Sequence, residues 1–96
     1  MLNSKQRSFL KSKAVDINDT IFIGKEGITD NLIKQLGKEL TANELIKGKA
    51  LESSLIDVND AAAKLAEMTN SQVVYTIGKK FVLYRENKDK TRYLLP

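Results

Sequence analysis

The stretch Thr20-Ile21-Phe22-Ile23-Gly24 constrains the fold more than any other part of this sequence. Its β-branched and aromatic residues run without interruption into a glycine, which predicts a short buried strand at Thr20–Ile23. Shortly afterwards Thr29 caps a segment with apolar residues at helical spacing, so the chain turns from strand to helix within one short loop. A second strand after that helix would lie parallel to the first through a right-handed crossover.

The remaining patterns extend this order into a single domain over residues 1–96, with a core at about 3–85 and a basic segment at 86–96. The last two strands would form an antiparallel hairpin through Gly78-Lys79. We therefore expect an α+β fold with the order α-β-α-β-α-β-β and a mixed four-stranded sheet packed against helices. Helices are predicted at Ser4–Ala14, from Thr29 to Leu40 and after a cap at Asp57, and strands at Thr20–Ile23, Glu44–Leu51, Gln72–Ile77 and Phe81–Arg85.

The absence of two residue types narrows the possible chemistry. The chain has no cysteine and no histidine, so it lacks a thiolate nucleophile, the usual zinc ligands and the usual general base near neutral pH. Carboxylate pairs such as Asp57/Asp60 look like helix-cap chemistry. We expect no enzymatic activity, no metal and no cofactor. No stretch has the pattern of a signal peptide or a membrane span, so a cytoplasmic protein without a membrane partner is expected. No small-molecule substrate is expected either, because a mononucleotide site would more typically carry a longer glycine-rich loop ending in Lys-Ser/Thr, or a third glycine.

Positive charge concentrates towards the two ends of the chain. The net charge is +4, and residues 1–13 carry no acid while residues 79–92 carry only Glu86 and Asp89. If the two ends meet in space, they form one patch suited to phosphates; if not, they are two solvated segments that keep the protein soluble. The bases concerned are Lys5, Arg7, Lys11 and Lys13 at the start, and Lys79, Lys80, Arg85, Lys88, Lys90 and Arg92 near the end.

The loop Gly24-Lys25-Glu26-Gly27 lies between the first strand and the helix capped by Thr29. Two glycines allow a tight turn and close approach of a ligand to the backbone, and the helix N-terminus presents amides to an anionic group. KH domains clamp a nucleic-acid backbone with such a G-x-x-G loop. The alternative is an ordinary strand-to-helix turn. Glu26 and Asp30 would repel a phosphate, and Lys25 offsets only one of them.

The hairpin Gly78–Arg85 is the second candidate segment. Lys79 and Lys80 would form a solvated positive prong, and Arg85 would either pair with Glu86 or contact RNA. The phenylalanines, Phe22 among them, lie in apolar runs and Tyr84 reads as a core residue. A base-stacking surface is therefore not expected, and binding directed at the nucleic-acid backbone fits better.

Taken together, four segments resemble the YhbY-type CRM domain, the chloroplast RNA splicing and ribosome maturation domain. They occur in the order and spacing of that family from about Asn3 to Arg85. Three departures are visible: Asn18-Asp19 stands where many members have Lys-Pro, Glu26 places an acid in the loop, and Gly48 replaces a branched residue. The four segments are Ser4–Lys11, Ile23–Thr29, Glu44–Lys47 and Ile77–Arg85.

The resemblance implies a fold similar to the C-terminal domain of bacterial initiation factor three. It also implies a stand-alone bacterial protein that binds structured RNA, with precursor large-subunit rRNA in a pre-ribosomal particle as its expected partner. The competing hypothesis is a protein-interaction module that docks its basic surface on an acidic ribosomal or assembly-factor partner. The RNA-binding residues implied are Gly24, Lys25, Glu26, Gly27, Thr29, Lys5, Arg7, Lys11, Lys47, Lys49, Lys79, Lys80 and Arg85.

Overall fold

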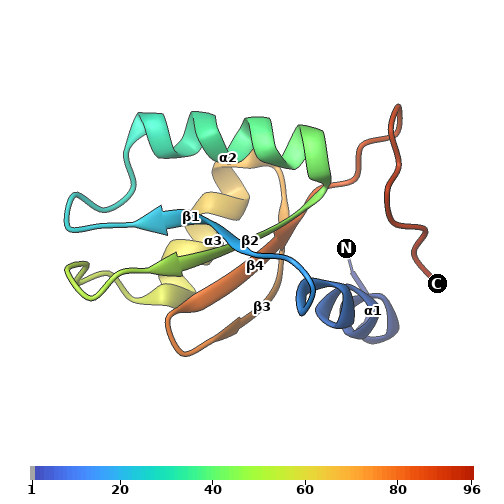
Figure 1. Ribbon diagram of the computed structural model, residues 1–96, viewed down its shortest axis with the longest axis horizontal. Helices are drawn as coiled ribbons and strands as arrows, with labels where there is room; N and C mark the ends of the chain where they lie inside the picture. The colour runs from blue at the N-terminus through green and yellow to red at the C-terminus, as the bar shows by residue number, and fades with distance from the viewer. Residues whose placement is uncertain (1) are drawn as a thin grey trace.

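The computed structural model describes residues 2–96 and has the predicted order of elements (Figure 1). The strands form one sheet in the order β1-β2-β4-β3, with β1 parallel to β2 and β4 antiparallel to both of its neighbours. The crossover and the hairpin predict this arrangement, and the α+β fold class is confirmed. The elements are α1 (Ser4–Ala14), β1 (Asp19–Ile23), α2 (Asp30–Asn43), β2 (Leu45–Ala50), α3 (Val58–Thr69), β3 (Gln72–Ile77) and β4 (Lys80–Tyr84).

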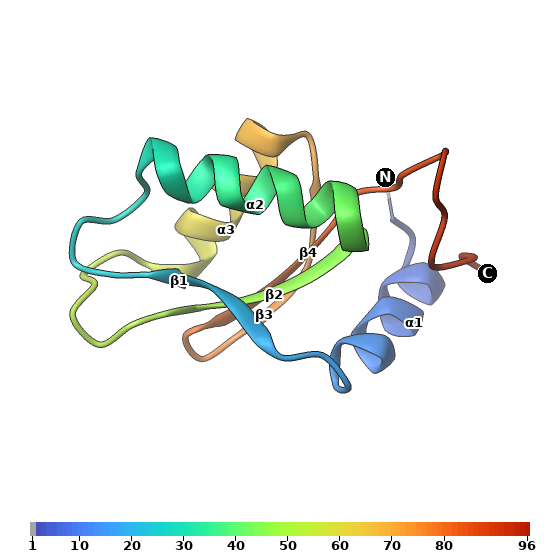
Figure 2. The same cartoon turned by 45° about the horizontal axis from the view of Figure 1, so that its top comes forward.

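Helices lie on both faces of the sheet (Figure 2). α2 and α3 cover one face, where Leu36 and Leu65 join Ile21 and Phe81 in the larger apolar cluster. α1 packs on the opposite face, where Leu10 belongs to a second cluster formed with side chains of β2, β3 and β4. Because α1 occupies only one end of that face, the end nearer the β1–α2 loop is left without a helix (Figure 1).

Each helix begins at a polar side chain that caps it. The Asn3 side chain accepts from the Gln6 amide, and the Gln6 side chain accepts in turn from Asn3, which completes a capping box. Thr29 caps α2 by accepting from the Leu32 amide, and Asp57 caps α3. The predicted caps at Thr29 and Asp57 are confirmed.

Gly48 in β2 lies in close contact with the Phe81 ring and the backbone of β1. A Cβ placed at this position would lie 2.3 Å from Cζ of Phe81 and 2.9 Å from the Ile21 carbonyl oxygen. Phe81 is fully buried, and its ring fills the space that a side chain of residue 48 would need. The departure from a branched residue at this position therefore has a packing cause.

The β3–β4 hairpin has the predicted two-residue connection, and Gly78 adopts a φ of 57°, which favours glycine. β4 begins at Lys80, one residue earlier than predicted, and Lys80 pairs with Ile77 across the turn. Lys80 is therefore a strand residue, and only Lys79 of the expected prong lies at the tip.

The segment 86–96 packs against the rest of the domain. The fully buried Glu44 side chain accepts from the backbone amides of Asn87, Arg92 and Tyr93. Tyr93 and Leu95 pack on the cluster beneath α1. Glu44 itself ends α2 with a φ of 64°, a backbone conformation that L side chains rarely adopt and that this buried contact set holds in place.

Candidate nucleic-acid interface

The loop between β1 and α2 is a tight turn closed by a hydrogen bond from the Gly27 amide to the Gly24 carbonyl, 3.0 Å long. Lys25 and Glu26 occupy the tip of this turn, and both side chains are exposed. The turn projects from one end of the molecule (Figure 1), so a ligand can reach its backbone.

The two glycines of this turn differ in what the fold demands of them. Gly27 has a φ of 72°, so a side chain there would strain the backbone. Gly24 has no such φ, and a Cβ added there would meet no atom within 4 Å. The turn geometry therefore accounts for Gly27, whereas neither backbone conformation nor packing requires glycine at position 24.

The N-terminus of α2 follows the turn directly. The Thr29 hydroxyl accepts from the Leu32 amide at 3.2 Å, so it serves as the helix cap. The amides of Asp30 and Asn31 precede the first helical hydrogen bond and have no partner within the helix. Phe22, Leu32 and the loop line a shallow hollow of about 300 Å³ beside this helix end.

Three backbone segments converge at the loop end of the sheet. The Leu51 amide donates to the Ile23 carbonyl just before the loop, and the Ala50 amide donates to the Lys79 carbonyl at the hairpin tip. The end of β2 therefore ties the G-x-x-G loop to the β3–β4 turn. We call Phe22, Gly24–Gly27, Lys49, Lys79 and Lys80 together the loop-end surface.

The lysines of the loop-end surface differ in their partners. Lys80 forms an ion pair with Asp19, with 3.3 Å between the ammonium nitrogen and the carboxylate oxygen. Among the described residues, Lys25, Lys49 and Lys79 form no ion pair. These three ammonium groups have no ion-pair partner in the part of the chain that the structure describes, and the exposed Glu26 stands next to Lys25 at the tip.

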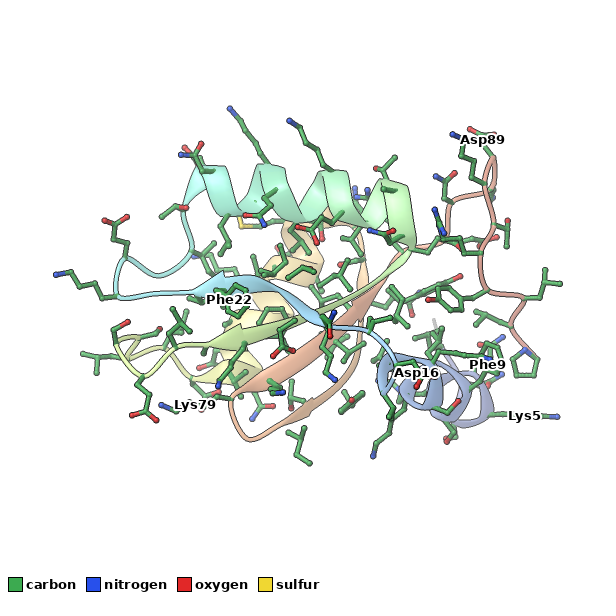
Figure 3. The ribbon with its side chains drawn as sticks, viewed as in Figure 1. Lys5, Phe9, Asp16, Phe22, Lys79 and Asp89 are labelled. Atoms are coloured by element: carbon green, nitrogen blue, oxygen red, sulfur yellow. The ribbon has the colours of Figure 1, made fainter. Side chains whose placement is uncertain are left out.

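The N-terminal bases lie at the opposite end of the molecule from the loop. Figure 3 shows Lys5 at one end of the long axis, with Phe22 and Lys79 towards the other, and that axis is 37 Å long. The bases of α1 therefore do not form one patch with the loop; the Gln6 side chain donates to the Pro96 carbonyl, so α1 lies instead beside the C-terminal residues (Figure 1). The order of elements does not reveal which end of the sheet α1 covers, and its apolar stripe packs at the far end.

Several predicted bases bond to the protein's own backbone. Arg7 donates to the carbonyls of Val73 and Val74 at 2.7 and 3.0 Å, where the β3–β4 register shifts. Lys47 donates to the last carbonyl of α1, and the Lys11 ammonium lies 5.1 Å from the Tyr75 ring centroid. These contacts hold α1 to the sheet.

Arg85 also bonds within the protein, to the last residue of α3 and to two residues inside α2. Its guanidinium donates to the Thr69 carbonyl at 2.7 Å, to the Gly37 carbonyl at 2.9 Å and to the Thr41 hydroxyl at 2.7 Å. The sequence suggests Glu86 or RNA as the partner of Arg85. In the structure its guanidinium bonds instead to α2 and α3 and so connects the two helices.

Phe22 is the residue that the sequence interpretation missed. Its side chain is 47% exposed, whereas Ile21 and Ile23 on either side are fully buried. Its position in an apolar run predicts a buried side chain, like those of the other phenylalanines. The alternation of β1, with both isoleucines on the core face, is the signal that places Phe22 on the opposite face.

The described residues contain no group of three acidic side chains that could hold a metal ion. In the same part of the chain, no helix has the length and apolar character needed to cross a membrane.

The CRS1 / YhbY (CRM) domain profile matches residues 2–85, which is most of the chain. This chain belongs to the CRM domain family. The resemblance carried by the four sequence segments is thus confirmed, and the match ends just before the segment that Glu44 anchors.

Relatives of this CRM domain are named for RNA binding. It is 44% identical over 96 residues to "Probable RNA-binding protein YqeI" of Bacillus subtilis, with both chains covered completely. It is 30% identical to an RNA-binding protein of Haemophilus influenzae, covering 92% of this chain and 89% of that one. A solution structure of Staphylococcus aureus SAV1595, described as a candidate RNA-binding protein, matches with a TM-score of 0.84 at 41% identity, with full coverage of both chains.

Proposed function

We propose that this CRM domain is a non-catalytic protein that binds structured RNA through the loop-end surface, and that it acts on the precursor of the large ribosomal subunit. The names of its bacterial relatives support RNA as the ligand. The assignment to ribosome assembly rests on the family resemblance, and the cytoplasm is expected because no stretch of the sequence has the pattern of a signal peptide or a membrane span.

The observation that carries the proposal is Gly24, a glycine that the structure of the turn itself does not require. Gly24 lies where no φ and no neighbouring atom requires glycine, while the surface beside it carries three lysines without acidic partners. A side chain at position 24 would block a ligand that approaches the backbone closely, and glycine avoids this obstruction. A polynucleotide phosphate fits the adjacent amides of α2 and the nearby ammonium groups.

Replacement of Gly24 tests this proposal directly. Gly24→Ala should fold like the parent protein and bind RNA about 10- to 100-fold more weakly, the loss expected for one or two contacts to a charged group. Gly37→Ala is the matched control, because Gly37 is equally unobstructed but lies within α2. An affinity unchanged by Gly24→Ala would remove the loop from the mechanism.

The lysines are tested by the salt dependence of binding. Lys25→Gln, Lys49→Gln and Lys79→Gln should each weaken binding and lower the log–log salt slope by about 0.7 per lost phosphate contact. Lys5→Gln, at the far end of the molecule, should leave the slope unchanged. An effect confined to Lys5 would move the interface to α1.

The identity of the RNA is tested in cells. Crosslinking followed by sequencing of the attached RNA should enrich precursor large-subunit rRNA over the mature form. A partner that stays bound after nuclease treatment, without any crosslinked RNA, would support the protein-docking alternative instead.

A further inference from the structure

Phe22 is an exposed aromatic residue in a protein that buries most of its large apolar side chains. It is nearly half exposed on β1, an edge strand of the sheet. Its neighbours Ile21 and Ile23 pack in the core, so the fold gains little from an aromatic ring at position 22. A single exposed apolar side chain is ordinary on a protein surface, so the case for Phe22 depends on the residues that lie beside it.

The sheet register places Phe22 in a row that crosses all four strands. Phe22 lies opposite Lys49, Lys49 opposite Lys80, and Lys80 opposite Ile77. Partners in register point to the same face of a sheet, so the row has two lysines between two exposed apolar side chains. α1 covers the other end of this face, so the row is open to solvent.

Phe22 also lines the hollow next to the G-x-x-G loop. That hollow has a volume of about 300 Å³, and its lining is completed by Thr29, Leu32 and the whole turn Gly24–Gly27, the acidic Glu26 included. A nucleotide whose phosphate contacts the loop would therefore have its base near the ring of Phe22. The π face of an aromatic ring accepts any base, and lysines beside it contact the flanking phosphates.

We propose that Phe22 is a stacking platform for one unpaired base of the RNA, with Lys49 beside it as the contact for an adjacent phosphate. This inference rests on the proposed RNA-binding function and specifies its substrate class. The RNA must present an unstacked nucleotide, from a loop, a bulge or a single strand, at the point where its backbone meets the loop. Lys49 is the lysine of the row that forms no ion pair, and its ammonium group favours a polyanion over an apolar protein partner on this face.

The test compares two RNA probes and three substitutions of Phe22. Phe22→Ala and Phe22→Leu should weaken binding of a single-stranded oligoadenylate by about 5- to 150-fold, and they should change binding of a fully paired duplex of equal length far less. The salt slope should stay as in the parent, because no charge is removed. Phe22→Trp should retain affinity.

Phe22→Trp also supplies a direct signal, since the chain contains no tryptophan. Its fluorescence should be quenched as the single-stranded probe binds, with a midpoint equal to the dissociation constant. Ile77→Ala is the control, because Ile77 is the exposed apolar residue at the other end of the row. It should leave the affinity for both probes unchanged.

Two outcomes would overturn the stacking proposal. One is equal affinity of Phe22→Ala and the parent for both probes while Gly24→Ala still weakens them, which would leave the loop function intact. The other is loss of a nuclease-resistant protein partner in both Phe22→Ala and Ile77→Ala without any change in RNA affinity, which would assign the row to protein docking. Failure of the proposed function itself would appear as loss of sensitivity to Gly24→Ala as well.

Discussion

The glycines of this domain occupy their positions for different physical reasons, so substitutions at them should have different effects on stability and binding. Gly48 admits the Phe81 ring, Gly27 supplies a positive φ, and Gly24 and Gly37 have free space around them. Spacing along the chain identifies the G-x-x-G loop. Only the structure shows that the turn requires Gly27 and does not require Gly24, which we attribute to a bound ligand.

Gly48→Ala should destabilise the domain by about 1–3 kcal/mol, because the new methyl group overlaps a fully buried ring next to backbone. Gly37→Ala should instead stabilise it by up to about 1 kcal/mol, since α2 is relieved of an interior glycine. Urea unfolding measures both changes. Equal stability of Gly48→Ala and the parent would show that Phe81 does not need this space.

The raised pKa of Tyr84 predicts that the domain loses stability at high pH. Burial, followed by the charges of Glu44 and Glu86, raises the pKa of Tyr84 from 10.0 to about 12. The unfolded chain therefore releases this proton at lower pH than the folded protein does, so the contribution of Tyr84 is complete below pH 10 and is lost as the pH rises towards 12.

The measurement is the stability difference between the parent and Tyr84→Phe across that pH range, since the lysines titrate alike in both proteins. The parent should lose stability relative to the variant as pH rises. A difference that stays constant from pH 9 to pH 12 would contradict the raised pKa of Tyr84.

Individual side-chain roles were the least predictable features, because they depend on which strand lies next to which. Arg85 follows an apolar strand in the sequence, yet its partners come from α2 and α3. Lys80 is adjacent to Lys79 in the chain, but its partner Asp19 comes from β1. The exposure of Phe22 could have been predicted, because side chains alternate between the two faces of β1 and both of its isoleucines face the core.

At the scale of elements, local patterns were sufficient to predict all helices and strands. Apolar periodicity and capping side chains act within a few residues, so both can be recognised in the sequence alone. The segment 86–96 lacks such periodicity. Its position depends on Glu44, whose carboxylate binds amides more than forty residues away in the chain.

Glu44→Gln should therefore cost about 1.5–3 kcal/mol of unfolding free energy, because a charged acceptor of three backbone amides becomes a neutral amide that carries its own donors. The Asn87 and Tyr93 amides should also lose protection against hydrogen exchange. Glu52→Gln, at an exposed turn, is the control and should change neither quantity. Full protection of these amides in Glu44→Gln would contradict the anchoring role.

At the scale of the whole molecule, the arrangement of charge could not be predicted from its distribution along the chain. Both termini are basic, but α1 packs at the end of the sheet opposite the G-x-x-G loop, and contacts within the fold occupy Arg7, Lys47 and Arg85. The interface that we infer is thus smaller than the sequence predicts. It combines one turn, one helix terminus and the open end of one sheet face.

RNA binding at the loop end of the sheet can be located by titrating the isotope-labelled protein with a hairpin RNA and following the amide chemical shifts. We expect the largest changes at Phe22–Asn31, Lys49 and Lys79–Lys80, while Lys5–Ser8 of α1 stay unchanged. Changes concentrated on α1, with the Gly24–Gly27 amides unmoved, would contradict it.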